Sequence, residues 1–463
     1  MTPPWGYDRP TMDKTSVAQL IEQHGIETVK IGTPDIDGVF RGKRLVAQQF
    51  LDGCDGAGFA QCDVIFGWDI AEELITEPAL AIGAADGGFA DVLLRPDLST
   101  FRIVPWEPSS AAVVCDVVDE HGEPVAQSPR TVLRRVIARA QQLGFTPMMS
   151  AEFEFRIFRE DQESLREKRY TDLRPLNPGL NCYSISHASI DDDVVGGLRR
   201  HMDAYGVDVE GYNREHGEGM YEMNLRYCGA LEAADRAMLF KSGAKEILAQ
   251  YGVVPTFMAK YSDQMDGCSG HIHQSLWQDD TNAFFEDGAS HSMSKAMHTY
   301  IAGLLDTLPE LFALYAPNIN SYRRYVSGSW APTAATWGIE NRTSSLRAIT
   351  SGASAMRIEN RTPGADVNAY LAFAACLAGG LSGIERGLAP PPPFAGDVYK
   401  SEGVRPLPRT LEAALDLFEQ SGVARDYLGD AFVDHYVAMR RWEVEKHRRA
   451  VTEWERRRYF EQV

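Results

Sequence analysis

The chain has 463 residues, 44% of them hydrophobic and 24% charged, a composition typical of globular proteins with room for a small and a large domain. Its formal net charge of −19 argues against nucleic acid and membranes as partners, since both would be repelled by most of the surface, and favours small-molecule substrates. Seven scattered cysteines without a C-x-x-C pair, and a first segment without an apolar core, predict a protein of the reducing cytoplasm.

The first quarter of the chain predicts a small β-rich domain over residues 14–125. Helical spacing of apolar residues predicts a helix over 15–24, which ends at Gly25. Short β-rich runs divided by Gly, Asp and Pro follow, and we expect strands at 28–31, 44–46, 92–94, 102–104 and 111–118.

The remaining residues, 126–463, predict a larger α+β domain. Ser128 and Pro129 begin an amphipathic helix over 128–143, which leads into a strand at 150–158. The segment 369–384 is apolar but short and interrupted by glycines, so it predicts a buried helix and no membrane span. Strands and helices are partly segregated, which favours the α+β class. Further strands are expected at 188–190, 207–210, 221–227, 255–258, 270–276 and 357–361, and further helices at 197–205, 233–251, 296–314 and from 410 onwards.

Two carboxylates in the strand at 150–158 form the first candidate for chemistry. Side chains alternate along a strand, so Glu152 and Glu154 share one face while Phe153, Phe155 and Ile157 share the other. Two negative charges this close repel each other unless a cation lies between them. An isolated pair of this kind is ordinarily a solvated edge, and matching groups later in the chain change the interpretation.

Similar groups recur on later segments. Glu210, Glu215 and Glu222 lie within thirteen residues, and His271 and His273 repeat the same i, i+2 spacing. Each pattern alone has an ordinary surface interpretation, such as an ion-pair ladder. Several strands whose paired polar groups point in one direction are harder to explain as ordinary surface residues. A set of oxygen ligands with imidazole selects Mg²⁺ or Mn²⁺ over zinc.

Arginine is concentrated between residues 323 and 361 in an otherwise acidic chain. A positive pocket beside a carboxylate cage suits a nucleoside triphosphate and a carboxylate substrate, because guanidinium groups neutralise the transferred phosphoryl group. Neither a Walker loop nor a Rossmann fingerprint is present. The six arginines are Arg323, Arg324, Arg342, Arg347, Arg357 and Arg361.

Several separated motifs resemble, in order and over nearly the whole chain, the signatures of the glutamine synthetase superfamily. The segment 37–44 resembles the branch that joins glutamate to amines other than ammonia. The resemblance implies a β-grasp-like N-terminal domain, an α+β catalytic domain with a curved antiparallel sheet, and a ring-shaped dodecamer of two hexamers with active sites between subunits. The motifs occupy 150–155, 215–222, 257–260, 267–276, 320–324, 331–342 and 357–371.

The resemblance also implies roles for single residues. Two or three Mg²⁺ or Mn²⁺ ions would be held by one set, Glu154, Glu215 and Glu222, and a second set, Glu152, His271 and Glu359. ATP would contact Glu210, Tyr227, His273, Ser275 and Arg357. Glutamate would contact Gly267, Arg324 and Arg361, and the catalytic arginines would be Arg342, Arg347 and Arg324. The implied reaction forms γ-glutamyl phosphate from glutamate and ATP, and an amine then displaces phosphate.

Three departures from the family pattern concern the amine. Ammonia-using members carry a flap glutamate where this chain has Trp330, which can neither attract nor deprotonate ammonium. The segment 58–63 replaces an Asp-Gly-Ser-Ser loop, and 218–220 reads Glu-Gly-Met instead of Pro-Gly-Gln. These changes predict a larger, less polar amine pocket. An arylamine, which is already neutral at working pH, would need no flap carboxylate, whereas an aliphatic amine would need a proton acceptor, for which Asp63 or Glu218 are candidates. Alternatively, Trp330 only packs in its loop while another acid replaces the flap glutamate, and Met220 has only an ordinary packing role.

The first hypothesis is therefore an ATP-dependent glutamate-amine ligase that makes a γ-glutamyl amide in amine catabolism or detoxification. The alternatives are a glutamine synthetase that uses ammonia and a non-catalytic sensor of glutamate or nucleotide. The sensor ranks last, because the metal-ligating and phosphate-handling residues are all present.

Overall fold

A computed structural model describes residues 12–76, 80–84 and 87–463. The N-terminal part forms a six-stranded sheet in the order β2-β1-β6-β4-β3, with β5 paired to β6. The pair β1–β6 is parallel and the other pairs are antiparallel. The predicted helix and five strands are confirmed, while α2 and β3 were not predicted. The elements are α1 Lys14–His24, β1 Thr28–Pro34, β2 Phe40–Val46, α2 Ala47–Gly53, β3 Phe59–Cys62, β4 Asp91–Pro96, β5 Arg102–Ile103 and β6 Ser110–Val118.

The larger part is built on a ten-stranded sheet in the order β14-β15-β16-β12-β7-β9-β8, with β10 and β11 paired to β7 and β13 to β12. All its pairs are antiparallel except β14–β15, so the expected antiparallel sheet is mixed at one edge. The α+β class is confirmed. The strands are β7 Thr146–Phe158, β8 Val209–Arg214, β9 Met220–Leu225, β10 Cys228–Gly229, β11 Val254–Thr256, β12 Gly270–Gln278, β13 Thr281–Asn282, β14 Trp337–Ile339, β15 Leu346–Ile349 and β16 Arg357–Asn360.

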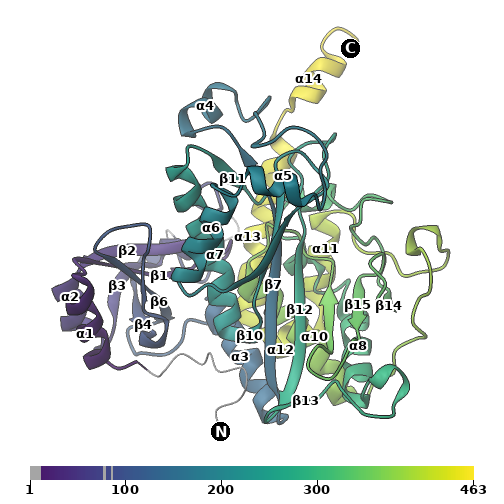
Figure 1. The fold of residues 1–463 in the computed structure, drawn as a ribbon, viewed down its shortest axis with the longest axis horizontal. Coiled ribbons are helices and arrows are strands. Elements are labelled where there is room, and N and C mark those ends of the chain that lie inside the picture. Colours follow the sequence, from purple (N-terminus) through teal and green to yellow (C-terminus); the bar gives the residue numbers. More distant parts are fainter. Residues whose placement is uncertain (1–11, 77–79, 85–86) are drawn as a thin grey trace.

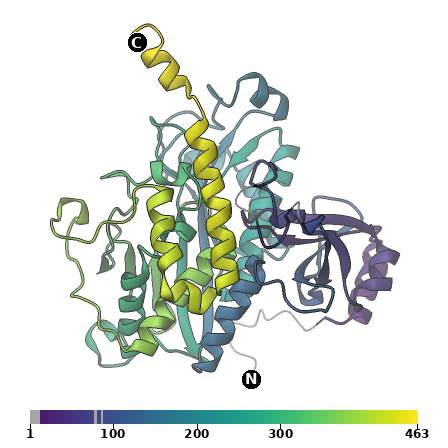
Figure 2. The same cartoon turned by 180° about the vertical axis from the view of Figure 1, so that it is seen from behind.

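Helices cover one face of this large sheet, as Figures 1 and 2 show from opposite sides. Phe153 and Phe155 of β7 are buried against this layer, and Phe153 stacks on Phe240 of α7 with ring centroids 5.9 Å apart. The opposite face of the sheet therefore carries the half-buried carboxylates. The helices are α3 Pro129–Gln142, α4 Gln162–Glu167, α5 Ile185–Ile190, α6 Val195–Ala204, α7 Ala230–Gln250, α8 Lys295–Thr307, α9 Phe312–Tyr315, α10 Ala369–Arg386, α11 Leu411–Gln420, α12 Gly422–Leu428, α13 Asp430–Arg449 and α14 Glu453–Tyr459.

Two expectations about the larger part were wrong. Residues 188–190 belong to helix α5 and not to a strand, because this exposed segment lies beside β8 without joining either sheet. The single helix expected over 296–314 is divided into α8 and α9, since Pro309 lacks the N–H that a continuing helix requires. Among the described residues, no helix is long and apolar enough to cross a membrane.

Buried polar side chains join the parts, among them Asn368 and Arg440. Asn368, at the start of α10, donates to the carbonyl oxygens of Asp35 and Ile36 at 3.0 and 3.1 Å. Arg440 of α13 pairs with Asp37 at 2.6 Å. By contrast, α14 extends away from the body (Figures 1 and 2), and the side chains of Trp454 and Phe460 are 60% and 84% exposed.

Candidate active site

The strand register brings the predicted metal ligands together. His271 of β12 lies opposite Glu152 of β7, and Glu222 of β9 lies opposite Glu154 of β7. Glu359 of β16 lies opposite His273 of β12. Residues directly opposite each other in a sheet have Cβ atoms about 5 Å apart. Groups more than two hundred residues apart in the chain therefore share one sheet face.

Glu152 is the centre of this cluster. Its Oε1 lies 2.8 Å from Nδ1 of His271, and its Oε2 lies 3.3 Å from Nε2 of His273. Glu359 Oε1 is 3.5 Å from Nδ1 of His271. Two triads have ligand atoms within 4.8 Å of one another, namely Glu152, His273 and Glu359, and Glu152, Glu222 and His271. His273 thus lies near the second metal set as well as on the nucleotide side.

The electrostatics of the cluster fit a divalent cation. Burial and the charges of Glu152, Glu154 and Glu215 raise the pKa of Glu222 to about 10. Burial also raises the pKa of Glu215, and the charge of Glu154 adds to this effect. Repulsion of this kind is relieved when a metal ion binds between the carboxylates, and oxygen donors with imidazole suit Mg²⁺ or Mn²⁺. The donor set therefore makes a possible metal site.

The carboxylates of the second set have the opposite shift. Burial opposes the charged form of Glu359, but Arg361, His271 and His273 hold its pKa at about 2. Glu152 is also buried, and hydrogen bonds from His271 and His273 nonetheless hold its pKa well below the usual range. These two carboxylates are therefore charged at neutral pH.

The other carboxylates of the first set are fixed by polar neighbours. Glu154 accepts a hydrogen bond from the backbone N–H of Ser269. Glu215 accepts from Nδ2 of Asn213 at 2.8 Å and from the backbone N–H of His216 at 3.2 Å. Glu154, Glu215 and Glu222 therefore lie on the side of the cluster formed by β7, β8 and β9.

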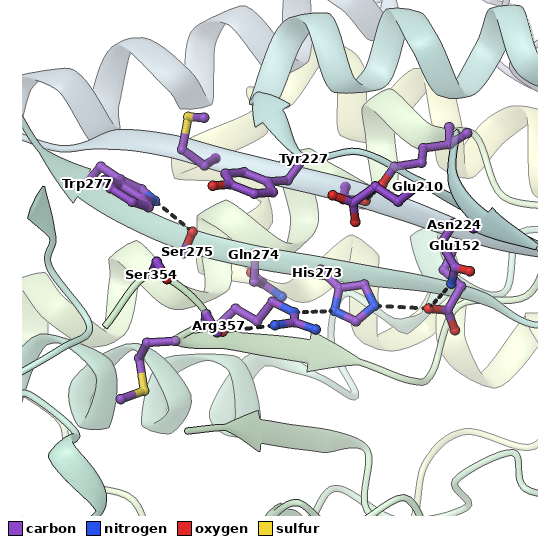
Figure 3. Close-up of a pocket in the computed structure, with 16 residues that line it drawn as sticks. Glu152, Glu210, Asn224, Tyr227, His273, Gln274, Ser275, Trp277, Ser354 and Arg357 are labelled. Carbon is purple, nitrogen blue, oxygen red and sulfur yellow. Dashed lines mark hydrogen bonds and ion pairs between the residues drawn. The ribbon is translucent and has the colours of Figure 1, made fainter. Parts of the chain in front are cut away.

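A cavity of about 600 Å³ opens beside the carboxylates, and all five residues predicted to contact ATP line it (Figure 3). Arg357 Nε donates to Nδ1 of His273 at 3.1 Å, and His273 Nε2 faces Glu152. A hydrogen-bonded series thus runs from the cavity to a predicted metal ligand. Sequence reasoning missed Trp277, whose Nε1 donates to Ser275, and Asn224, although Asn224 shares the face of Glu222 two residues away. The five predicted residues are Glu210, Tyr227, His273, Ser275 and Arg357.

Two predicted arginines, Arg347 and Arg361, reach Glu359, one of the predicted metal ligands. Arg347 Nη1 donates to Glu359 Oε2 at 3.0 Å, and its Nε donates to Glu340 at 3.1 Å. Arg361 also pairs with Glu359, and its Nε donates to the carbonyl oxygen of Arg342 at 3.0 Å. The side chain of Arg342 itself is exposed. The structure therefore brings Arg347 and Arg361 to the carboxylates, but not the guanidinium of Arg342.

Arg324 and Gly267 form a tightly packed pair. Arg324 is 2% exposed and donates to the carbonyl oxygen of Thr362 and to Oγ of Ser269, both at 2.9 Å. A Cβ atom on Gly267 would lie 2.7 Å from Cγ of Arg324, so the approach requires glycine. The guanidinium of Arg324 is therefore held by a backbone carbonyl and a hydroxyl group.

The residues predicted to meet the amine lie on separate segments of the chain. Trp330 is 61% exposed in a loop and has a φ of 60°. Asp63 is 8% exposed in the N-terminal part and accepts from the backbone N–H of Gly83 at 3.1 Å. Glu218 accepts from the backbone N–H of Gly179 at 3.2 Å. Met220 is 3% exposed and belongs to the hydrophobic core, so its role is packing.

Comparisons with known proteins show which family the chain resembles. Residues 126–459 match the family described as glutamine synthetase, catalytic domain. A glutamate–isopropylamine ligase of Pseudomonas sp is 42% identical over 96% of this chain and 97% of its own. A γ-glutamylethanolamide synthetase of Streptomyces coelicolor is 39% identical over 98% of both chains. Relatives named glutamine synthetase also match, at 40% identity or less.

The solved structure of GmaS in complex with ADP superposes with a TM-score of 0.84, at 29% identity, over 96% of this chain and 99% of that one. The match of sequence and fold covers most of the chain. The protein therefore belongs to the glutamine synthetase family.

Proposed function

We propose that the protein is an ATP-dependent ligase that joins the γ-carboxylate of glutamate to an amine bulkier than ammonia and so makes a γ-glutamyl amide in amine catabolism or detoxification. The observation that carries the proposal is the convergence of carboxylates and histidines from β7, β9, β12 and β16 beside a nucleotide-sized cavity. The names of the isopropylamine and ethanolamide relatives support an amine, and an aliphatic one rather than an arylamine, as the second substrate.

Two or three divalent cations, Mg²⁺ or Mn²⁺, would supply positive charge that neutralises the transferred phosphoryl group. One set of ligands is Glu154, Glu215 and Glu222, and the other is Glu152, His271 and Glu359. ATP would occupy the cavity of about 600 Å³, where Arg357 and Ser275 offer polar contacts. The raised pKa of Glu222 supports this assignment, because Glu152, Glu154 and Glu215 crowd negative charge around this buried carboxyl group.

The protein side chains would then act by binding and charge neutralisation. Gly267, Arg324 and Arg361 would hold glutamate so that a γ-carboxylate oxygen attacks the γ-phosphorus of ATP and ADP leaves. Arg342 and Arg347 would neutralise the phosphoryl group during transfer. The amine nitrogen then attacks the carbonyl carbon of γ-glutamyl phosphate, phosphate leaves, and Asp63 or Glu218 takes the amine proton.

Trp330 would make the amine side apolar. Its indole can pack on an alkyl group but offers no proton acceptor. In one chain Trp330 is mostly exposed, and Asp63 lies in the N-terminal part. Both observations are consistent with an amine pocket completed by a neighbouring subunit.

We further propose the ring-shaped dodecamer of two hexamers, divided in each subunit into the domains 14–125 and 126–463. Exposed apolar side chains on the extended C-terminal segment, including Trp454 and Phe460, support contact with another subunit. Free thiols on all seven cysteines support a place in the reducing cytoplasm. Mass photometry of the purified protein tests the assembly, and a predominant mass near 51.4 kDa would contradict it.

A phosphate-release screen tests the reaction. Glutamate, ATP and Mg²⁺ are combined in turn with ammonia, alkylamines, ethanolamine, polyamines and anilines. We expect saturable release with an alkylamine or ethanolamine, and loss of at least a hundredfold in Glu359→Ala and Arg342→Ala, with both variants folded by circular dichroism. Full activity in either variant would reject its assigned role.

Ammonia-dependent glutamine synthesis is the second candidate, because several relatives carry that name. In the same screen, saturable release with ammonia alone would favour it over the amine ligase.

A further inference from the structure

Asn224 of β9 contacts one carboxylate from each proposed metal set. Its Nδ2 donates to Glu152 Oε2 at 2.6 Å and lies 3.3 Å from Glu222 Oε1. Figure 3 shows Asn224 and Glu152 meeting at one end of the cavity. The register explains both contacts, since Asn224 lies opposite Glu152 and two residues after Glu222 on the same strand face. None of the roles described above includes Asn224.

The chemistry of an amide suits this position. The amide nitrogen has two hydrogens to donate and carries no charge, whereas a carboxylate only accepts. A hydrogen bond to one oxygen of each carboxylate orients both groups and leaves their remaining lone pairs for cations. Removal of a group that orients a metal ligand in this way commonly lowers the metal affinity by about 10–100-fold.

Asn213 offers an internal comparison. Its Nδ2 donates to Glu215 Oε1 at 2.8 Å, and Glu215 belongs to the first set only. Asn213 of β8 lies opposite Glu222 of β9, so its side chain lies on the same sheet face as that of Asn224. One asparagine therefore contacts ligands of both sets, and the other contacts a ligand of a single set.

We propose that Asn224 is a positioning residue that couples the two metal sites by orienting Glu152 and Glu222 with a single amide. The inference rests on the proposed function, because it takes the two sets as metal ligands. Loss of the amide frees a ligand of each site and weakens cation binding at both. Loss of the Asn213 amide weakens binding at one.

Titration of the full-length protein with Mn²⁺ tests the inference. The electron paramagnetic resonance signal of free Mn²⁺ measures how much of the ion is bound. We expect Asn224→Ala and the similarly sized Asn224→Leu to weaken both sites about tenfold or more. Asn213→Ala should weaken one site, and Gln278→Ala, at the exposed far end of β12, should weaken neither. With saturating Mn²⁺, kcat should recover in Asn224→Ala while the metal concentration for half-maximal rate stays raised.

Unchanged Mn²⁺ affinity in folded Asn224→Ala and Asn224→Leu, or weakening at one site only, would overturn the inference. Circular dichroism shows which variants are folded. Glu152→Gln separates this failure from failure of the proposed function. If Glu152→Gln binds Mn²⁺ as the parent does, the ligand assignment itself is wrong, whereas strong weakening by Glu152→Gln without an effect of Asn224 rejects the positioning role alone.

Discussion

At the scale of single residues, Trp330 is the position that separates amine classes. A neutral indole cannot accept a proton from ammonium, and a carboxylate at the same position can. We expect Trp330→Glu to raise kcat/KM for ammonia relative to an alkylamine by about tenfold or more. Steady-state phosphate release with both substrates measures this ratio.

Two neighbouring variants control for the added charge and the lost indole. Val326→Glu adds a carboxylate to the same exposed loop, four residues earlier, and should leave the preference unchanged. Trp330→Phe keeps an apolar ring and should also leave the preference between ammonia and the alkylamine unchanged. An amine profile of Trp330→Glu equal to that of the parent would show that Trp330 does not face the amine.

Sequence reasoning worked well for residues whose role follows from local alternation. Glu152 and Glu154 were placed on one strand face and Phe153 and Phe155 on the other, and burial agrees. It did not find Asn224, because the contact with Glu152 depends on how β9 pairs with β7. It also did not predict that Arg347 would share Glu359 with Arg361. Such contacts are set by register across strands, which a single sequence does not specify.

At the scale of elements, the start of α10 stabilises both parts of the molecule. The side chain of Asn368 accepts from the backbone N–H of Tyr370, as a helix cap, and donates to the carbonyl oxygens of Asp35 and Ile36. Thr410 caps α11 by accepting from Ala413 at 3.2 Å and makes no such second contact. The two residues therefore separate capping from the contact between parts.

We expect Asn368→Ala to lower the free energy of unfolding by about 2–3 kcal/mol, from a lost cap and buried carbonyl groups left without a donor. Thr410→Ala should cost about 1 kcal/mol, the cap alone. Urea unfolding followed by circular dichroism measures both. Equal losses in the two variants would mean that the contacts to Asp35 and Ile36 contribute little.

Helices and strands could be predicted where their apolar residues repeat with a clear period. The ends of these elements were harder to predict. The strand over 150–158 and the helix over 128–143 were found because apolar residues repeat with a clear period. The helix α5 was missed because its six residues have no buried face to set a period. Pro309 marked the end of α8 in the sequence, but the apolar run through Leu314 outweighed it in the prediction.

At the scale of the whole molecule, α13 connects the catalytic part to the N-terminal part. Arg440 pairs with Asp37, and Nε1 of Trp442 donates to Asp69 at 3.2 Å. His435 lies on the same helix and is 3% exposed. Burial lowers the pKa of His435 to about 4, against a weaker opposing effect from the backbone of Phe66. The folded protein therefore holds this imidazole neutral at pH values where an unfolded chain would protonate it.

This difference makes stability depend on pH through His435. Between its unfolded pKa of about 6.5 and its folded pKa of about 4, the unfolded chain binds more protons, so stability is lost as the pH falls through this window. The loss from this group is at most about 3 kcal/mol. His435→Phe removes the group, and we expect its free energy of unfolding to fall less than that of the parent between pH 7 and pH 4.5.

The matched variant is His447→Phe, because His447 is exposed on the same helix and should leave the pH dependence of the parent unchanged. Urea unfolding at pH 7, 6, 5 and 4.5 gives the dependence for all three proteins. A parallel loss of stability in His435→Phe and the parent would assign acid sensitivity to other groups. A smaller loss in His435→Phe alone would show that protonation of one buried imidazole weakens the helix that connects the two parts.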